Sequence, residues 1–452
     1  MRWRLAALGA TLAVVAGSGA AYVMVRDDKT PSGRGSVATP TPQPVRSPAL
    51  AALAATAAEP TRQGIARQLR RATRAPALGG ALAGLVVDGE SGDPLFVRRP
   101  DAALAPASTT KLLTAIAALE TLGPDATLTT NVVRSGRTLY LVGGGDVTLA
   151  AVARDVYPAP ATLATLAART ASAVAGTRFR VRYDDSVWQG PRTATGWPPT
   201  HVSGGNVAPV SALEVDEGRL TGFTSVHPQP READPAEAAA TAFRAALISA
   251  GVRVSGSVGR ARAPDLAPIA SVRSPPVGAL VQRMLTDSDN DLAEALARAT
   301  AIRQGKPPTF DGAAAAVIAA LDRAGLPTTS ARLYDGSGLS PLDRVTPRLL
   351  VAALRLVTSR PELNPITAGF PVAGFSGTLA DRYRHRPTRD GAGVVRAKTG
   401  TLAGVNTLAG TVTDADGRLL LFAFMTDRAA DPDTTEAALD RLAAELADCD
   451  CR

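Results

Sequence analysis

The sequence predicts a mixed α/β protein of the α+β kind, in which helices and strands share a large core. The chain has 452 residues, more than one small core organises, so about two or three domains are expected. Apolar residues make up 45% of the chain and aromatic residues only 4%. Apolar side chains recur at helical spacing in some segments and in short runs bounded by turn residues in others, which predicts both helices and strands.

The N-terminal segment 1–28 predicts export. Arg2 and Arg4 precede an apolar run from Leu5 to Val25, which has the layout of a signal peptide. The run is long enough to span a bilayer as an uncleaved anchor, and a small-residue cleavage site within it is the alternative. The rest of the chain is therefore expected outside the cytoplasmic membrane, either secreted or held there by the anchor.

Behind this segment, the composition predicts a linker and two interleaved domains. Residues 29–60 are rich in Pro, Ser and Thr and predict an extended tether. Segments 61–125 and 270–452 are predicted to form one catalytic domain. Segment 126–269 is predicted to be a mainly β domain inserted into it.

The first catalytic segment begins with a helix predicted at 62–73. The apolar run 81–88 predicts a strand that ends in a Gly/Ser/Asp turn, and 95–97 is its predicted hairpin partner. Residues 108–122 carry apolar side chains at helical spacing until Gly123 and a proline stop the helix.

Segment 126–269 contains more strand-like runs than helical ones. Strands are predicted at 127–134, 138–142 and 179–183 because these runs are apolar or β-branched and are separated by turn residues. A helix is predicted at 235–250, followed by a short strand at 252–254.

The last segment returns to helical spacing at 276–285 and 291–302, on either side of a polar break. Apolar and β-branched runs predict the strands that follow, and a closing helix completes the chain. These strands are expected at 394–398, 408–412 and 419–426, and the helix at 434–447.

The net charge of +8 comes almost wholly from arginine, since the lysines are Lys29, Lys111, Lys306 and Lys398 alone. Because only lysine can supply a neutral amine near physiological pH, the few lysines draw attention. A positive surface could attract anionic wall polymers or phospholipid headgroups, and a solvated Arg-rich surface is the simpler interpretation. Without basic patches interleaved with aromatic residues, no nucleic-acid partner is expected.

The histidines and cysteines predict no metal site and no cofactor. His201, His227 and His385 are far apart in the sequence, which disfavours a zinc site and a Ser-His-Asp triad. Cys449 and Cys451 are separated by one residue at the C-terminus, so a mutual disulfide is expected to be geometrically awkward.

Ser108 and Lys111 are the first candidate catalytic pair. They lie one turn apart at the start of the predicted helix 108–122, so the amine can reach the hydroxyl, and the helix N-terminus favours nearby negative charge. A neutral Lys111 could deprotonate Ser108. An exposed surface pair is the ordinary alternative for this spacing.

Two further motifs favour the catalytic interpretation of Ser108 and Lys111 over a surface pair. Ser288 and Asn290 lie in the polar break between two predicted helices, where an N-cap is the structural alternative. Lys398 to Thr401, with sequence Lys-Thr-Gly-Thr, are predicted to end one strand and begin another. They offer charge and hydroxyls, and Gly400 lets a ligand approach the backbone. In this order the three motifs form the signature of penicillin-recognising serine enzymes.

The neighbouring strings resemble one family, the low-molecular-mass class C penicillin-binding proteins, also described as penicillin-binding protein 4 type D-Ala-D-Ala carboxypeptidases. The resemblance spans about residues 80 to 450 and rests on particular strings. These are 104–114, 144–149, Asp184-Asp185-Ser186, Ser211-Ala212-Leu213, Asp335-Gly336-Ser337-Gly338-Leu339-Ser340 and Lys398-Thr399-Gly400-Thr401-Leu402.

The resemblance implies a transpeptidase-like, β-lactamase-like domain with a five-stranded antiparallel sheet flanked by helices. It implies hydrolysis of D-Ala-D-Ala in peptidoglycan stem peptides through an acyl-serine, with β-lactams as covalent inhibitors. The chain is shorter between Ser108 and Ser288 than the longest family members, which puts substrate reach in doubt.

The resemblance also assigns roles to the residues of the three motifs. Ser108 would be the nucleophile and Lys111 its base, Ser288 a proton relay and Asn290 a binder of the peptide carbonyl. The Lys-Thr-Gly motif would bind the terminal carboxylate. Its expected substrate-binding residues are Lys398, Thr399, Gly400 and Thr401, with the N–H groups of Ser108 and Thr401 as oxyanion hole.

Three other readings compete. A class A β-lactamase uses a Glu four residues before an Asn, but Arg360 holds that place before Asn364. A non-catalytic wall-binding protein of the same fold is the alternative from another class, which the intact motifs disfavour. Endopeptidase cleavage of crosslinks uses the same acyl donor and stays open beside carboxypeptidase activity.

Overall fold

The computed structural model describes residues 57–221, 228–428 and 431–452, which all belong to one compact unit. The predicted export segment 1–28 and most of the predicted linker 29–60 lie outside the described residues. Among the helices that are described, none has the length and apolarity needed to cross a membrane.

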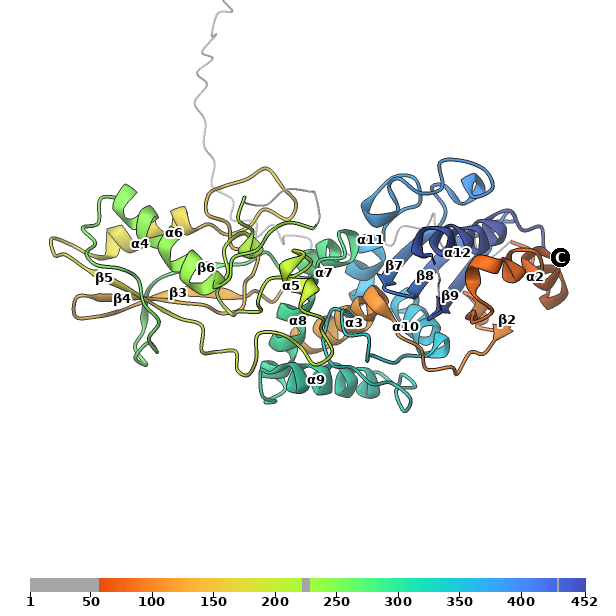
Figure 1. Cartoon of the computed structure of the whole chain (residues 1–452), viewed down its shortest axis with the longest axis horizontal. Helices are drawn as coiled ribbons and strands as arrows, with labels where there is room; N and C mark the ends of the chain where they lie inside the picture. Colours follow the sequence, from red (N-terminus) through yellow and green to blue (C-terminus); the bar gives the residue numbers. More distant parts are fainter. Residues whose placement is uncertain (1–56, 222–227, 429–430) are drawn as a thin grey trace, which may run out of the picture. The chain divides into compact units, whose positions relative to one another are not determined.

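The catalytic part is built on a five-stranded sheet in the order β2-β1-β9-β8-β7, with every neighbouring pair antiparallel (Figure 1). This confirms the predicted fold class. The strands are β1 Ala83–Asp88, β2 Pro94–Arg98, β7 Arg396–Leu402, β8 Val405–Thr413 and β9 Leu419–Thr426.

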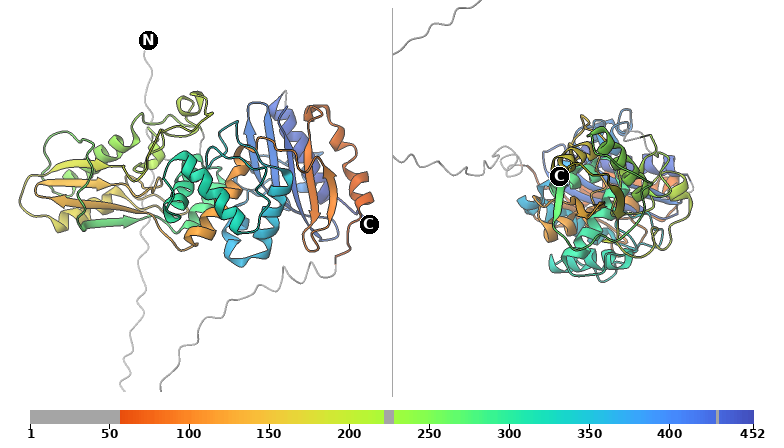
Figure 2. Two further views of the ribbon diagram at one scale, coloured as in Figure 1. Left: turned by 90° about the horizontal axis from the view of Figure 1, so that it is seen from below. Right: turned by 90° about the vertical axis from the view of Figure 1, so that its left-hand side faces the viewer.

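Helices cover both faces of this sheet. Successive side chains of a strand point to opposite faces, and apolar side chains lie on both. In β9, Leu421 and Ala423 face the core that contains α3 (Thr110–Leu122), whereas Phe422 and Phe424 face the core that contains α12 (Pro432–Ala447). Figures 1 and 2 show these helices around the sheet. The α12 side also carries α2, and the α3 side carries α7 to α10.

Each helix predicted in the catalytic part is present, and α9, α10 and α11 lie between residues 310 and 369, where no helix was predicted. Those of the catalytic part are α2 Arg62–Leu69, α3 Thr110–Leu122, α7 Val277–Thr286, α8 Asn290–Arg303, α9 Phe310–Arg323, α10 Pro347–Ser359, α11 Asn364–Gly369 and α12 Pro432–Ala447. The predicted helix 62–73 ends earlier, and a separate 3-10 turn follows at Ala72–Arg74.

A second sheet of four strands, in the order β5-β4-β3-β6, is formed by the segment predicted to be inserted together with the residues just after it. Its neighbours pair antiparallel except β4 and β5, which are parallel. Helices α4 and α6 pack on it, and a short α5 follows β5. The elements are β3 Thr129–Ser135, β4 Thr138–Val142, α4 Leu163–Ala173, β5 Arg180–Asp184, α5 Thr200–Ser203, α6 Pro235–Ser249 and β6 Pro268–Arg273.

The prediction of a strand at 252–254 is wrong. The predicted domain boundaries remain a prediction. Residues 252–254 form no strand, because Val254 makes only an isolated bridge to Phe179. The sheet also extends to Arg273, beyond the predicted boundary at 269. A separate domain at 126–269 therefore remains a proposal of this article.

Cys449 and Cys451, whose pairing was expected to be geometrically awkward, do form a disulfide. Their Cα atoms lie 5.1 Å apart, within the roughly 4.4–6.8 Å that disulfides span. Helix α12 ends just before them, so the chain can turn and bring the two side chains together. Both are buried, and the Cys451 carbonyl accepts a 2.6 Å hydrogen bond from the Thr61 N–H.

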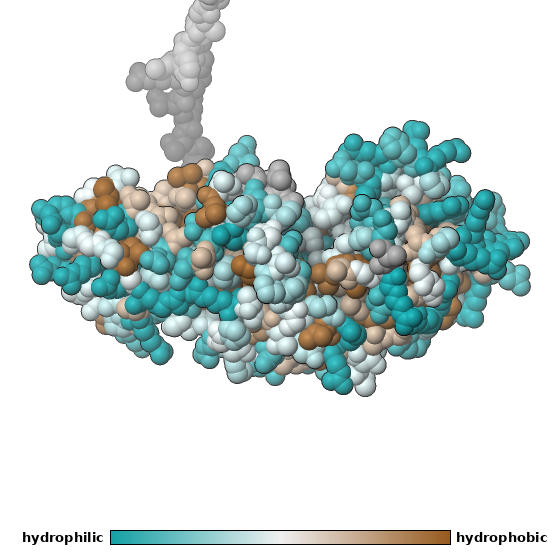
Figure 3. Space-filling view, in the orientation of Figure 1, coloured by the Kyte–Doolittle hydropathy of each residue, from teal (hydrophilic) through white to brown (hydrophobic). Residues whose placement is uncertain are grey.

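The surface on the face of Figure 3 is mostly hydrophilic, with apolar residues scattered over it. Among the described residues, the most exposed large apolar side chains are Phe375 and Tyr157, at 73% and 70%. They belong to distant segments of the chain.

Candidate active site

Ser108 lies in the 3-10 turn Ala107–Thr109 that leads into α3. Ala107 has a φ of 47°, which a residue other than glycine rarely adopts, so surrounding contacts must hold the turn. The carbonyl of Pro106 accepts hydrogen bonds from the side chains of Thr109 at 2.7 Å and Thr407 at 2.8 Å. Strand β8, which carries Thr407, therefore anchors the turn that presents Ser108.

Lys111 lies at the start of α3 and is completely buried. Its amine lies 3.0 Å from the Ser108 Oγ, 2.7 Å from the Asn290 Oδ1 and 2.7 Å from the Ser337 carbonyl oxygen. Burial lowers the pKa of Lys111 to about 8, against the opposing effect of carboxylates such as Asp335. A substantial neutral fraction near pH 8 suits Lys111 to accept a proton from Ser108.

Ser288 lies in the break between α7 and α8, with a φ of 57° that is unusual for serine. Its hydroxyl accepts a 2.9 Å hydrogen bond from the amine of Lys398. The N-cap of α8 is instead Asp289, whose carboxylate accepts from the Leu292 N–H. The cap and the functional candidates are therefore different residues of one motif.

Lys398, Thr399 and Gly400 lie on the edge strand β7, within one continuous strand. The prediction that Lys-Thr-Gly ends one strand and begins another is thus wrong. The amine of Lys398 is buried and also donates to the Thr399 carbonyl at 2.8 Å. Burial lowers the pKa of Lys398 well below its usual value, and the positive charges of Lys111 and Arg382 act in the same direction.

Gly400 allows β7 to approach the turn that carries Ser108. A Cβ at this position would collide with the hydroxyl of Thr407 on β8, and would lie 2.8 Å from the Pro106 carbonyl oxygen and 3.0 Å from the Ala107 Cβ. Thr401, the next residue, is exposed. All three motifs are therefore neighbours: Lys111 contacts Ser108 and Asn290, Lys398 contacts Ser288, and Gly400 packs on the turn.

The comparisons with known proteins agree with this arrangement. The chain matches the family described as D-Ala-D-Ala carboxypeptidase 3 (S13) over residues 65–232 and 224–446. The chain belongs to this family. Carboxypeptidase DacB of Mycolicibacterium smegmatis is 38% identical over 427 residues, covering 91% of this chain and 90% of that protein.

More distant relatives point the same way. The D-alanyl-D-alanine carboxypeptidase of Actinomadura sp. (strain R39) is 32% identical over 427 residues, covering 76% of this chain and 77% of that protein. The structure of penicillin-binding protein 4 from Haemophilus influenzae superposes with a TM-score of 0.68 at 22% identity, covering 81% of this chain and 95% of that one. The predicted family and fold are confirmed.

This S13 protein is a serine-type D-Ala-D-Ala carboxypeptidase of the penicillin-binding class, as its family and relatives show. The predicted enzyme class is therefore confirmed. Membership of a family of cell-wall peptidases implies a site of action outside the cytoplasm.

Motif reasoning missed a turn of this carboxypeptidase, Asp335 to Ser340, that completes the site. The Ser337 carbonyl contacts Lys111, and the carboxylate of Asp335 accepts 2.7 Å hydrogen bonds from the N–H groups of Gly338 and Ser340. The string was recognised in the sequence, but a backbone carbonyl leaves no residue-type signal. The hydroxyl of Thr378, 2.8 Å from that of Thr399, was missed for want of any motif.

The segment predicted to be inserted also contacts the site of this S13 enzyme. The side-chain amide of Asn290 donates to the Asn206 carbonyl at 2.8 Å, and the Ala208 N–H donates to Asp291 at 2.8 Å. The Trp197 indole N–H donates to Asp335 at 2.7 Å. One wall of the site therefore comes from residues that no sequence motif had singled out.

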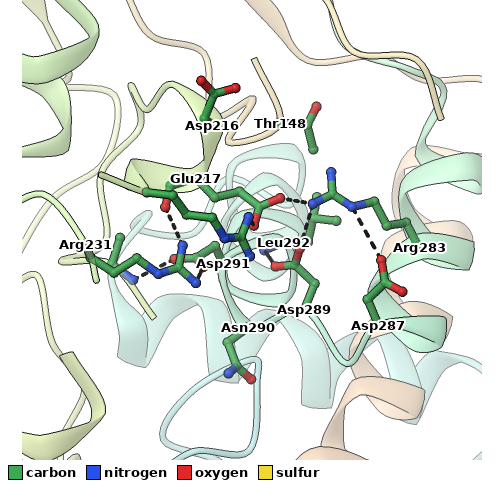
Figure 4. A network of polar contacts seen from close by, with 12 residues as sticks. Thr148, Asp216, Glu217, Arg231, Arg283, Asp287, Asp289, Asn290, Asp291 and Leu292 are labelled. Carbon is green, nitrogen blue, oxygen red and sulfur yellow. Dashed lines mark hydrogen bonds and ion pairs between the residues drawn. The ribbon is translucent and has the colours of Figure 1, made fainter. Parts of the chain in front are cut away.

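Three carboxylates behind this wall, Glu217, Asp289 and Asp291, lie within 4.8 Å of one another (Figure 4). Arginines already engage them: Arg231 pairs with Asp291 at 3.1 Å, and Arg283 pairs with Asp289 at 3.1 Å and also with Glu217. Burial raises the pKa of Glu217 to about 8, against these positive charges. We therefore interpret the cluster as an ion-pair network that fixes the start of α8.

Proposed function

We propose that this chain removes the terminal D-alanine from peptidoglycan stem peptides through an acyl-enzyme on Ser108. The observation that carries the proposal is the buried amine of Lys111, 3.0 Å from the Ser108 hydroxyl oxygen. Nucleophile and base at hydrogen-bond distance are what acyl transfer by a serine requires.

In the acylation step, the Oγ of Ser108 attacks the carbonyl carbon of the D-Ala-D-Ala bond while its proton passes to neutral Lys111. The oxygen of the tetrahedral intermediate is stabilised by the backbone N–H groups of Ser108 and Thr401. The C–N bond then breaks as the proton that Lys111 took from Ser108 passes through Ser288 to the leaving D-alanine amine, which leaves Lys111 neutral again. Water hydrolyses the ester, which restores Ser108.

Substrate is held by the residues around the nucleophile. Asn290 binds the peptide carbonyl, and Lys398, Thr399 and Thr401 bind the terminal carboxylate through charge and hydroxyls. A bound carboxylate favours the charged form of Lys398, against the burial that lowers its pKa. Gly400 leaves the backbone of β7 accessible. The hydrogen bond from Lys398 to Ser288 and the one between the hydroxyls of Thr378 and Thr399 support this assignment, because they orient the groups along one edge of β7.

β-Lactams are the proposed covalent inhibitors, since their strained amide occupies the place of the D-Ala-D-Ala bond. A related structure, penicillin-binding protein 4 of Haemophilus influenzae, has been determined with a β-lactam. We further propose that the chain is exported and acts at the cell wall, secreted or anchored by its N-terminal segment.

Mass spectrometry of muropeptides after incubation with the purified protein tests this function. Loss of one alanine from pentapeptides is the expected product, and cleavage of crosslinked dimers would add endopeptidase activity. Unchanged muropeptides, with a Ser108→Ala variant as baseline, would contradict the proposal.

A further inference from the structure

Glu294, on α8, holds the turn that faces Lys111. One oxygen of its buried carboxylate, Oε1, accepts hydrogen bonds from the N–H groups of Gly336 at 3.0 Å and Ser337 at 2.9 Å. The next carbonyl along the turn, that of Ser337, contacts the Lys111 amine at 2.7 Å. Glu294 is thus one peptide unit away from the oxygen that orients Lys111.

The other carboxylate oxygen of Glu294 is paired with Arg298, one turn later on the same helix, at 3.2 Å. The side chain of Arg298 is only 1% exposed, and its guanidinium lies 4.0 Å from the ring centre of Phe310 and 5.2 Å from that of Trp188. Stacking on two aromatic rings fixes the cation in place. Arg298 therefore holds Glu294 in one orientation.

Stability alone does not account for this pair. Taking two charges out of water costs free energy that their attraction only partly offsets, and apolar residues of similar volume are often as stabilising. Buried charges are better explained when their position serves another group. Here that group is the turn, because the two N–H donors of Gly336 and Ser337 have Glu294 as their acceptor.

We propose that Glu294, held by Arg298, is a positioning residue that fixes the Ser337 carbonyl and so directs the Lys111 amine at the Ser108 hydroxyl. This inference rests on the proposed function, in which Lys111 is the base. Neither Glu294 nor Arg298 touches the reacting atoms, so both act through the turn.

The charges around Lys111 give this role a measurable signature. Glu294 and Asp335 face it through the turn, Asp289 and Asp291 lie at the start of α8, and Lys398 faces it from β7. Burial is the main cause that lowers the pKa of Lys111, and the carboxylates oppose it. Burial raises the pKa of Glu294 itself to about 7, so its carboxylate is mostly charged near pH 8, where Lys111 titrates. Removing this charge therefore lowers the pKa of Lys111 further.

Two substitutions separate the hydrogen bonds from the charge. Glu294→Gln keeps an oxygen that can accept from both N–H groups and removes the negative charge. Glu294→Leu removes both. In a third variant, Glu294→Leu with Arg298→Leu, neither partner of the pair is left as a lone buried charge.

The rate of acylation by a fluorescent penicillin is measured against pH for each variant, with thermal unfolding alongside. Glu294→Leu and the double variant are expected to acylate at least about tenfold more slowly, since misplacing a reacting group by about 1 Å costs up to about a hundredfold. Glu294→Gln should retain most of the wild-type acylation rate, and the acid limb of its pH–rate profile should shift to lower pH.

The inference would be overturned if Glu294→Leu and the double variant fold and acylate at the wild-type rate. It would also be overturned if the acid limb of the pH–rate profile of Glu294→Gln coincides with that of the wild type. If Glu294→Leu does not fold, the Glu294→Gln limb and the rate of the double variant decide. Lys111→Arg is measured in parallel: wild-type acylation by Lys111→Arg would mean that the proposed function itself fails, whereas a slow Lys111→Arg beside unaffected Glu294 variants would refute only the positioning role.

Discussion

The amine of Lys398 donates a 2.9 Å hydrogen bond to the hydroxyl of Ser288, which joins edge strand β7 to the break between α7 and α8. Lys111 makes the matching connection on the other side, from Ser108 to Asn290. The two buried lysines thus link three motifs that are far apart in the sequence. Predictions follow for each part of this arrangement.

Lys111→Arg is expected to be nearly inactive although it preserves the positive charge. A guanidinium stays protonated at any workable pH and cannot accept the Ser108 proton. The measurement is the rate of acylation by penicillin, with Lys306→Arg, outside the site, as control. Near-normal acylation by Lys111→Arg would mean that Lys111 acts only through its charge.

The acylation rate is expected to rise with pH and level off above about 8. The base must be neutral, and burial places the pKa of Lys111 at about 8, so protonation removes the base as the pH falls below that value. Each pH unit below the midpoint should cost about tenfold in rate. A flat profile between pH 6 and 9 would contradict a titrating Lys111 base.

Lys398→Ala should lower kcat/KM for a D-Ala-D-Ala peptide by roughly ten- to a hundredfold. A charge-assisted hydrogen bond to the terminal carboxylate contributes about 1.5–3 kcal/mol. Amidating that carboxylate should cause a similar loss in the wild type and little further loss in Lys398→Ala. Equal hydrolysis of acid and amide by the wild type would remove the carboxylate-binding role, and Lys306→Ala is the matched control.

Gly400→Ala should slow acylation at least about tenfold, because the new methyl group has no room between β7 and the turn that carries Ser108. The measured quantities are the penicillin acylation rate and the unfolding temperature. A folded variant with the wild-type rate would show that the turn can shift without consequence for Ser108.

Much of the fold could be predicted because the spacing of apolar residues along the sequence indicates which side chains are buried. Strand β9 has the predicted bounds, and α8 differs from the predicted 291–302 by one residue at each end. Gly400, by contrast, lies inside the continuous strand β7, although the sequence predicts that Lys398 to Thr401 end one strand and begin another. The need for glycine there comes from close contact with Thr407, Pro106 and Ala107, which no local sequence pattern records.

The candidate site was predictable where side-chain chemistry recurs in short motifs, as with Ser108 and Lys111. Contacts made by the backbone were not, because any residue type has a carbonyl or an N–H. The carbonyls of Ser337 and Asn206 are therefore absent from the predicted site although both contact it. Glu294 belongs to none of the three motifs, and the N–H groups that it accepts from, those of Gly336 and Ser337, are far away in the sequence. Its contact with the turn is therefore visible only in the folded structure.

Intact-mass measurement after incubation with penicillin tests the central claim most directly, that Ser108 is the nucleophile. The account predicts one covalent adduct on the wild-type protein, carried by the peptide that contains Ser108, and none on a folded Ser108→Ala variant. A penicillin adduct that persists on Ser108→Ala would contradict the account.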